Sequence, residues 1–291
     1  MHPGNWRDGA YLSAAAPILI GGCGRSGTTL LRVILDSHPN LCCGPESNLF
    51  LVGKTHRLSV DELAFKFDLP PGRIIEMQQA SPSLAEFIDR FFSAYATARG
   101  RPRWAEKTPK NVTVLDFIGA HFPQAKFVHV IRDGRDVACS LRTHPRHQVV
   151  DGRLVRLDTR NPWKLGVSRW VEDVRAGLRF RADSRYREIR YEDLVAKPEP
   201  ALRGLFDFIG EPWDERVLNF HAERGSARDV RKFPQNPEAT RPLYPDAMGR
   251  WRTEMTGAEA DVFKALAGPL LLELGYETDN SWSPVDGEPP R

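Results

Sequence analysis

Short apolar runs alternate along this chain with segments whose apolar residues repeat every three to four positions. Residues 17–22 form an apolar run that ends in two glycines, and residues 28–37 then place Leu31 and Leu35 on one side of a helix. A second apolar run, residues 126–131, is also followed by a helical segment. Because buried parallel strands are short and apolar and are joined through helices, the pattern predicts an α/β fold. We expect a single domain of three layers, with helices on both faces of a central parallel sheet.

The same periodicity locates the other regular elements. Helices are expected at residues 58–67, 83–98, 111–121, 136–142, 163–182, 200–209 and 255–274, and a further strand at residues 188–191. Gly210 follows one of these helices, at the position where glycine commonly ends a helix.

The domain is expected to span residues 17–276. Residues 1–16 precede the first strand as an N-terminal extension, and a helical cover or substrate region is expected at about residues 50–100. Residues 222–250 contain two glycines, four prolines and many charges, which predicts an irregular and mobile loop. The polar C-terminal tail, residues 277–291, is expected to be frayed.

The composition is that of an ordinary globular protein. Of the 291 residues, 41% are hydrophobic and 27% are charged, which allows a sizeable core and argues against a disordered chain. The formal net charge of +3 is mild and the basic residues are scattered. A dedicated nucleic-acid-binding protein is therefore disfavoured.

The cysteines and the apolar runs bear on where the protein resides. Four cysteines show no C-x-x-C metal spacing, and Cys42 and Cys43 are adjacent, which favours a reducing compartment over a disulfide framework. The sequence has no stretch of about 18 apolar residues, and no charged leader precedes an apolar run. These features predict a cytoplasmic protein without a membrane span.

The glycine-rich turn after the first strand is the first sign of chemistry. Gly22-Cys-Gly-Arg-Ser-Gly-Thr-Thr29 has the spacing of a phosphate loop, with Thr28 where a triphosphate-binding loop carries lysine. Glycines let backbone N–H groups converge on an anion at the start of a helix. The expected donors are Ser26, Gly27, Thr28 and Thr29, and Arg25 would supply the cation. An anionic ligand is therefore expected, with a plain strand-to-helix turn as the alternative.

The Gly-Arg-Ser-Gly-Thr-Thr-Leu core of this turn resembles the phosphosulfate-binding loop of the sulfotransferase family. Residues 127–136 together with Ser140 resemble that family's motif for the 3′-phosphate. Three segments also fall where the family has related ones: Glu106-Lys-Thr-Pro109, Arg190-Tyr-Glu-Asp-Leu194 and Gly249-Arg-Trp251. The resemblance covers about residues 17–276. In residues 25–46 the chain is most similar to tyrosylprotein sulfotransferases and their bacterial relatives.

The resemblance implies a nucleotide with two phosphate sites. 3′-Phosphoadenosine 5′-phosphosulfate (PAPS) would be the sulfuryl donor and 3′-phosphoadenosine 5′-phosphate (PAP) the product. Arg132 and Ser140 would bind the 3′-phosphate, since an arginine at a strand end can fork two N–H bonds to it; a salt bridge to Asp133 is the alternative. The resemblance also suggests Tyr191, packed on adenine or simply in the core, and Ser226 and Arg241 in the irregular loop.

The same resemblance assigns the catalytic groups. Glu46 is the candidate general base for the acceptor hydroxyl, with a surface carboxylate or a helix cap as the alternative. Lys107, with Arg25, would neutralise charge on the oxygen that bridges phosphorus and sulfur. His121, His129 and His144 are weaker candidates for the base. No aspartate suited to Mg²⁺ is evident beside the loop, so no metal is predicted.

The sequence therefore predicts a sulfotransferase that moves a sulfuryl group from PAPS to an acceptor hydroxyl. The acceptor is left open between a tyrosine or other phenol, a carbohydrate, a peptide and a small metabolite, and a homodimer is compatible with the sequence. A P-loop kinase or another nucleoside-triphosphate-dependent phosphotransferase is the first rival, because it shares the strand, loop and helix. A non-catalytic nucleotide-binding protein is the second.

Overall fold

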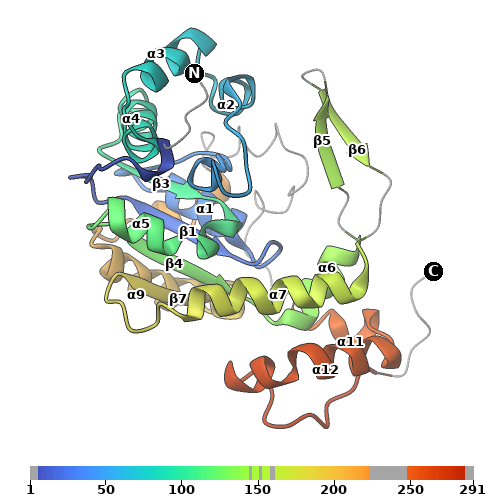
Figure 1. Cartoon of the computed structure of the whole chain (residues 1–291). Coiled ribbons are helices and arrows are strands. Elements are labelled where there is room, and N and C mark those ends of the chain that lie inside the picture. The colour runs from blue at the N-terminus through green and yellow to red at the C-terminus, as the bar shows by residue number, and fades with distance from the viewer. Residues whose placement is uncertain (1–5, 144–145, 151–152, 158–160, 223–247, 286–291) are drawn as a thin grey trace.

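A five-stranded sheet forms the centre of the molecule (Figure 1). The computed structural model describes residues 6–143, 146–150, 153–157, 161–222 and 248–285. The strands are β1 (Ile18–Gly22), β2 (Leu41–Cys43), β3 (Arg103–Lys107), β4 (Lys126–Ile131) and β7 (Tyr186–Arg190). They are all parallel, in the order β2-β3-β1-β4-β7. Helices flank both faces, which confirms the predicted α/β fold with a central parallel sheet.

The central strand β1 is buried on both faces. Ile18, Leu19 and Ile20 have no exposed surface. Because successive side chains of a strand point to opposite faces, Ile18 and Ile20 pack into one apolar core while Leu19 packs into another. Such a strand carries apolar residues without alternation, which is the feature that predicted it.

Three helices cover the face that carries Ile18 and Ile20. They are α1 (Thr28–Ser37), α8 (Tyr191–Ala196) and α9 (Pro198–Ile209). Helix α9 ends at Gly210, whose φ of 76° lies in the left-handed region that a side chain disfavours. The predicted end of this helix is therefore confirmed.

The opposite face is covered by α4 (Leu84–Thr97), α5 (Leu115–His121) and α7 (Trp163–Leu178). Helices α2 (Val60–Phe67) and α3 (Pro71–Gln79) pack against α4, in the region expected to be a helical cover. The Oγ atoms of Ser59 and Ser83 accept 3.2 Å hydrogen bonds from the amides of Glu62 and Glu86. These N-caps explain where α2 and α4 begin.

Beyond the carboxyl end of β4, a third apolar core joins α7 to α6 (Gly134–Thr143), α11 (Trp251–Glu254) and α12 (Gly257–Glu273). Thr256 and Glu259 form a capping box that starts α12. Strands β5 (Arg146–Val150) and β6 (Arg153–Leu157) form an antiparallel hairpin that stands apart from the main sheet (Figure 1). Short 3-10 helices lie at Trp6–Asp8, Leu49–Leu51, Pro109–Thr113, Glu215–Val217 and Phe220–Ala222.

Several elements differ from the sequence prediction. The helix expected at 111–121 is divided into the 3-10 helix Pro109–Thr113 and α5, with Val114 between them at a non-helical φ of −132°. Tyr191 starts α8 instead of ending β7. The sequence did not predict β2, β3, α3 or the β5–β6 hairpin.

Both ends of the described chain are packed onto the domain. Trp6 is 9% exposed and donates from Nε1 to the carbonyl of Ser81 at 3.0 Å. Trp282 is 8% exposed and contacts the rings of Trp251 and Phe263. As far as Val285, the C-terminal tail is therefore not frayed as expected, because an aromatic side chain holds it against the third core.

Candidate active site

The glycine loop joins β1 to α1 through two residues with left-handed backbone. Arg25 has a φ of 73° and Gly27 a φ of 93°. No side chain caps α1 at Gly27, so the first amides of this helix are available to a ligand. Ser26 is completely buried, and its hydroxyl has no hydrogen-bond partner among the described residues. A buried donor without a partner beside free amides is what a phosphate-binding loop requires.

Gly27 is needed because a tyrosine lies directly against it. A Cβ at this position would lie 2.5 Å from Cδ2 of Tyr191. The guanidinium of Arg132 lies 4.4 Å from the centre of the same ring, and its Nη1 donates to the carbonyl of Arg25 at 3.1 Å. Tyr191 is 8% exposed. The Tyr191 ring thus packs against both Gly27 of the loop and the guanidinium of Arg132. Its predicted contact with adenine stays a prediction.

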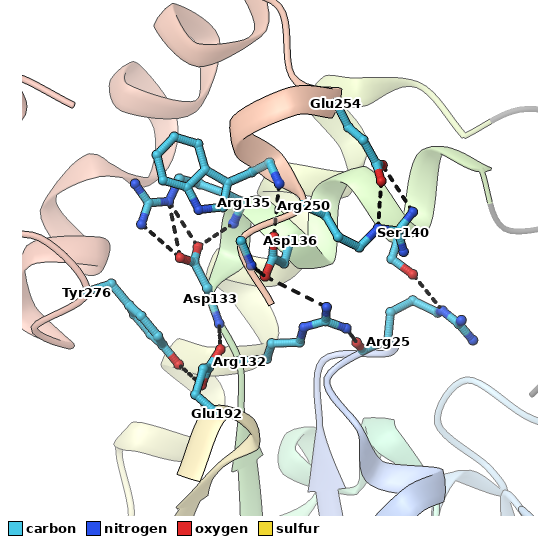
Figure 2. Close-up of polar contacts among 12 residues, drawn as sticks. Arg25, Arg132, Asp133, Arg135, Asp136, Ser140, Glu192, Arg250, Glu254 and Tyr276 are labelled. Carbon is cyan, nitrogen blue, oxygen red and sulfur yellow. Dashed lines mark hydrogen bonds and ion pairs between the residues drawn. The ribbon is translucent and has the colours of Figure 1, made fainter. Parts of the chain in front are cut away.

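The predicted 3′-phosphate residues lie together beside the loop (Figure 2). Arg25 Nε donates to the hydroxyl of Ser140 at 3.1 Å. Arg132 lies at the end of β4, with Nη2 3.8 Å from Oδ2 of Asp136 on α6. The structure therefore brings Arg25, Arg132 and Ser140 into one cluster of donors. This proximity is expected of two phosphate-binding motifs that share one ligand.

Asp136 connects this cluster to a distant part of the chain. Its two carboxylate oxygens accept the amides of Gly249 at 2.8 Å and Trp251 at 3.0 Å. The residue is 1% exposed. These bonds fix the start of α11 to α6, the helix that follows Arg132. From the sequence, the two segments were linked only because both resemble motifs of the same family.

Arg135, in the same motif, is a structural residue. It is 2% exposed and pairs with Asp133 at 2.8 Å and with Glu277 at 2.5 Å. Its guanidinium lies 3.7 Å from the ring centre of Trp251 and 4.6 Å from that of Trp282. These partners neutralise its charge, so Arg132 is the arginine of this motif that faces the loop (Figure 2).

The predicted catalytic residues meet at the other end of the loop. Lys107 at the end of β3 is nearly buried, and its Nζ donates to Oγ1 of Thr29 at 3.1 Å and to Oε1 of Glu46. The Glu46 side chain is 42% exposed and that of Lys107 only 3%. Burial raises the pKa of Glu46, but the charge of Lys107 and its hydrogen bond lower it by more, so the carboxylate is ionised at neutral pH.

A further ion cluster under the loop was not predicted. Asp173 on α7 is completely buried and accepts a 2.5 Å bond from Nζ of Lys110, and Nε of Arg169 lies 3.7 Å from its second oxygen. Burial, and then the negative charge of Asp173, raise the pKa of the thiol of Cys23, the first residue after β1. The helical periodicity of α7 marked only its apolar side, so nothing in the sequence pointed to this carboxylate.

The remaining candidates lie elsewhere. His129 is completely buried, its Nδ1 lies 2.6 Å from the hydroxyl of Tyr186, and burial lowers its pKa to about 4. His121 Nδ1 lies 2.8 Å from the carbonyl of Tyr11. Both histidines therefore have structural partners. Ser226, Arg241 and His144 fall outside the described residues. Within the described part of the chain, no group of three or more His, Cys, Asp or Glu residues could hold a metal ion.

Comparison with known sequences found matches over most of the chain. Residues 17–215 match the model of the sulfotransferase family. A protein-tyrosine sulfotransferase of Drosophila melanogaster is 27% identical over 285 residues, which cover 94% of this chain and 54% of that protein. Protein-tyrosine sulfotransferase A of Caenorhabditis elegans is 27% identical, with 97% and 72% covered. The chain thus spans about half the length of the fly protein.

Solved structures show the same fold. The sulfotransferase domain from the Synechococcus olefin synthase gives a TM-score of 0.66 at 24% identity, over 90% of this chain and 98% of that domain. The sulfotransferase domain from the curacin biosynthetic pathway gives 0.63 at 20% identity, over 89% and 98%. At these identities the likeness concerns the fold.

The relatives also correct the expected location. The cytoplasmic assignment is contradicted by this comparison, because the curated relatives are protein-tyrosine sulfotransferases. Free cysteines occur in proteins of many compartments, so they could not carry that assignment. None of the helices in the described ranges has the length and hydrophobicity that crossing a bilayer requires.

Proposed function

Because this chain belongs to the sulfotransferase family, we propose that it transfers a sulfuryl group from PAPS to the hydroxyl of an acceptor. The observation that carries the proposal is the position of Lys107. Its Nζ contacts both Thr29 in the loop and Glu46, the candidate base. A cation from the neighbouring strand thus stands at the loop, where a triphosphate-binding loop would use its own lysine.

The residues of the loop fit such a nucleotide. The unpartnered hydroxyl of Ser26, the amides that start α1, and Thr28 and Thr29 would hold the 5′-phosphosulfate. At the other end, Arg132 and Ser140 would hold the 3′-phosphate. The bound nucleotide supplies an activated sulfuryl group, and the protein has to position and stabilise charge around it.

Glu46 and Lys107 have different roles in the proposed transfer. Glu46 is ionised at neutral pH, so its carboxylate can take the proton of the acceptor hydroxyl as the new bond forms. Lys107 can donate hydrogen bonds to the phosphate oxygen that departs, which stabilises the negative charge developing there. The ion pair leaves room for both roles: only Oε1 of Glu46 contacts Lys107, and Thr29 and Glu46 use two of the three N–H groups of the ammonium.

The acceptor follows from the relatives only as a first candidate. Proteins named protein-tyrosine sulfotransferases match most of this chain, so a tyrosine hydroxyl in a peptide is the first class to test. Phenols, carbohydrates and small metabolites come next. A homodimer is also proposed, and light scattering of the pure protein would check it.

Transfer of label from ³⁵S-labelled PAPS to a panel of acceptors tests the proposal. We expect a labelled product with at least one hydroxyl acceptor, and we expect the reaction to continue in the presence of a metal chelator. A kinase would instead need ATP and Mg²⁺ and would transfer no sulfur. Binding of PAP without any transfer would favour the non-catalytic alternative.

A further inference from the structure

A second buried carboxylate lies next to the catalytic lysine. Glu106 precedes Lys107 in β3 and is 1% exposed. Its side chain points to the opposite face of the sheet, because Glu106 is in register with Leu19 and Lys107 with Ile20. Within the described part of the chain, no Lys, Arg or His lies within ion-pair distance of Glu106. It does not touch the reacting groups, so any role in the reaction must act through its neighbours.

Four neutral donors satisfy this carboxylate. Oε1 accepts the hydroxyl of Ser47 at 2.9 Å, the amide of Ser47 at 3.3 Å and the hydroxyl of Thr108 at 2.6 Å. Oε2 accepts Nδ2 of Asn111 at 2.6 Å. An ionised carboxylate can accept at both oxygens without donating, and no other side chain of this size can do so.

The origin of these donors links the two halves of the catalytic pair. Ser47 directly follows Glu46, and Thr108 directly follows Lys107. Glu46 and Lys107 are 61 residues apart, so the chain between them cannot fix their separation locally. Glu106 therefore holds the backbone next to Glu46 against the strand that carries Lys107.

We propose that Glu106 is a positioning residue, which fixes the Glu46 carboxylate at Nζ of Lys107 by binding both N–H and O–H of Ser47. This inference rests on the proposed function for the role of the Glu46–Lys107 pair, whereas the contacts themselves are present in the structure. Burial raises the pKa of Glu106, and its hydrogen bonds lower it by less. Burying a carboxylate costs free energy of desolvation, so we expect Glu106 to have a role other than packing.

The test compares Glu106→Ala with the conservative Glu106→Gln. In Glu106→Gln, the carbonyl oxygen can keep the bonds from Ser47. The amide of Asn111 can turn so that its Oδ1, which has no partner among the described residues, accepts from the new NH₂. We expect a kcat within about fivefold of wild type for Glu106→Gln. For Glu106→Ala we expect a loss of roughly 10²-fold, since a displacement of about 1 Å can cost that much.

Two further readouts separate positioning from mere stability. PAP affinity should stay within about threefold in Glu106→Ala, because the loop and Arg132 are untouched. The acid limb of kcat/KM, which reports the free enzyme, should move to higher pH, because Glu46 loses the contact with Lys107 that lowers its pKa. Asp89→Ala is the matched control: Asp89 is a buried carboxylate on α4 bonded to Tyr11 and Ser13, away from the pair.

The pKa of Glu46, followed by its carboxyl ¹³C shift in the ligand-free protein, makes the test independent of turnover. An increase in Glu106→Ala, absent in Glu106→Gln and Asp89→Ala, supports the proposal even if no acceptor is ever found. An unchanged pKa of Glu46 overturns it, and so does a kcat loss that Asp89→Ala reproduces. If Glu106→Ala fails to fold, Ser47→Ala takes its place in the same test. We then expect a smaller increase in the pKa of Glu46, and an unchanged pKa would again overturn the proposal.

Discussion

The two ends of the site hold their charges in different ways. At the catalytic end, a 3% exposed Lys107 is paired with a 42% exposed Glu46. At the 3′-phosphate end, Arg132 and Asp136 are 6% and 1% exposed, and Asp136 also binds two backbone amides. The first pair can separate because water can solvate the released carboxylate. The second cannot, since a buried pair is costly to break.

This difference matches the tasks of the two ends. A base has to release the proton it has accepted to solvent in every turnover, whereas a phosphate-binding arginine has to keep one orientation. Arg132 is held by the ring of Tyr191, the carbonyl of Arg25 and the charge of Asp136. These contacts orient the guanidinium before a ligand arrives, which lowers the entropic cost of binding.

Replacing the movable carboxylate should have the largest effect. Glu46→Gln keeps the shape but cannot accept a proton, so we expect kcat to fall by about 10²- to 10⁴-fold. PAP affinity should change by no more than about threefold, which calorimetry would measure beside steady-state rates. Glu76→Gln on α3, an exposed carboxylate paired with Arg73 at 3.1 Å, is the matched control and should leave kcat unchanged. Full activity of Glu46→Gln would show that another group removes the proton.

Removing the fixed cation should weaken binding and not the proton transfer. Arg132→Ala loses a charge-assisted hydrogen bond of about 1.5–3 kcal/mol, equivalent to a 10- to 150-fold weaker affinity for PAP. Adenosine 5′-monophosphate, which lacks the 3′-phosphate, should bind almost as before. Arg132→Lys should fall between the two, because an ammonium cannot bind bidentately. Equal losses for both nucleotides would contradict the assignment of Arg132.

The elements that could be predicted from the sequence are those that a single type of residue marks. β1 and β4 were predictable because strands buried on both faces are uniformly apolar, and the loop because glycines mark its backbone. β3 was missed because Arg103, Glu106 and Lys107 break the apolar pattern. In the structure each has at least one partner distant in sequence: Arg103, for example, pairs with Glu211 at 3.0 Å.

Long-range pairing also limited the prediction of the site. The contact between Glu46 and Lys107 could be expected only through resemblance to a family, since residue types and spacing do not encode it. Asp136 was placed in the right motif, yet its bonds to Gly249 and Trp251 depend on a segment more than 100 residues away. Trp282 gave no sign that it would bury the tail, because a single aromatic residue has no periodicity.

The anchor of the fixed end should be visible in stability. Asp136→Asn keeps one acceptor oxygen but turns an NH₂ toward one of the two amides it binds, so a buried donor loses its partner. We expect the free energy of unfolding to fall by about 1–3 kcal/mol in urea denaturation. Asp261→Asn, at an exposed position on α12, is the control and should change it by less than about 0.5 kcal/mol. An equally small effect at Asp136 would mean that its amide bonds do not hold α11.

The smallest effect is expected at Ser140, where the fixed end meets the loop. Ser140→Ala removes the hydroxyl that accepts from Nε of Arg25 at 3.1 Å, and with it one donor for a 3′-phosphate. One such hydrogen bond is worth about 0.5–1.5 kcal/mol, so PAP affinity should fall by about two- to tenfold. Ser37→Ala, which deletes a buried hydroxyl bonded to the carbonyl of Ile34, should lower stability without changing that affinity. A loss at Ser140 as large as that of Arg132→Ala would mean that the hydroxyl orients Arg25, and the two ends of the site would then be coupled through this one contact.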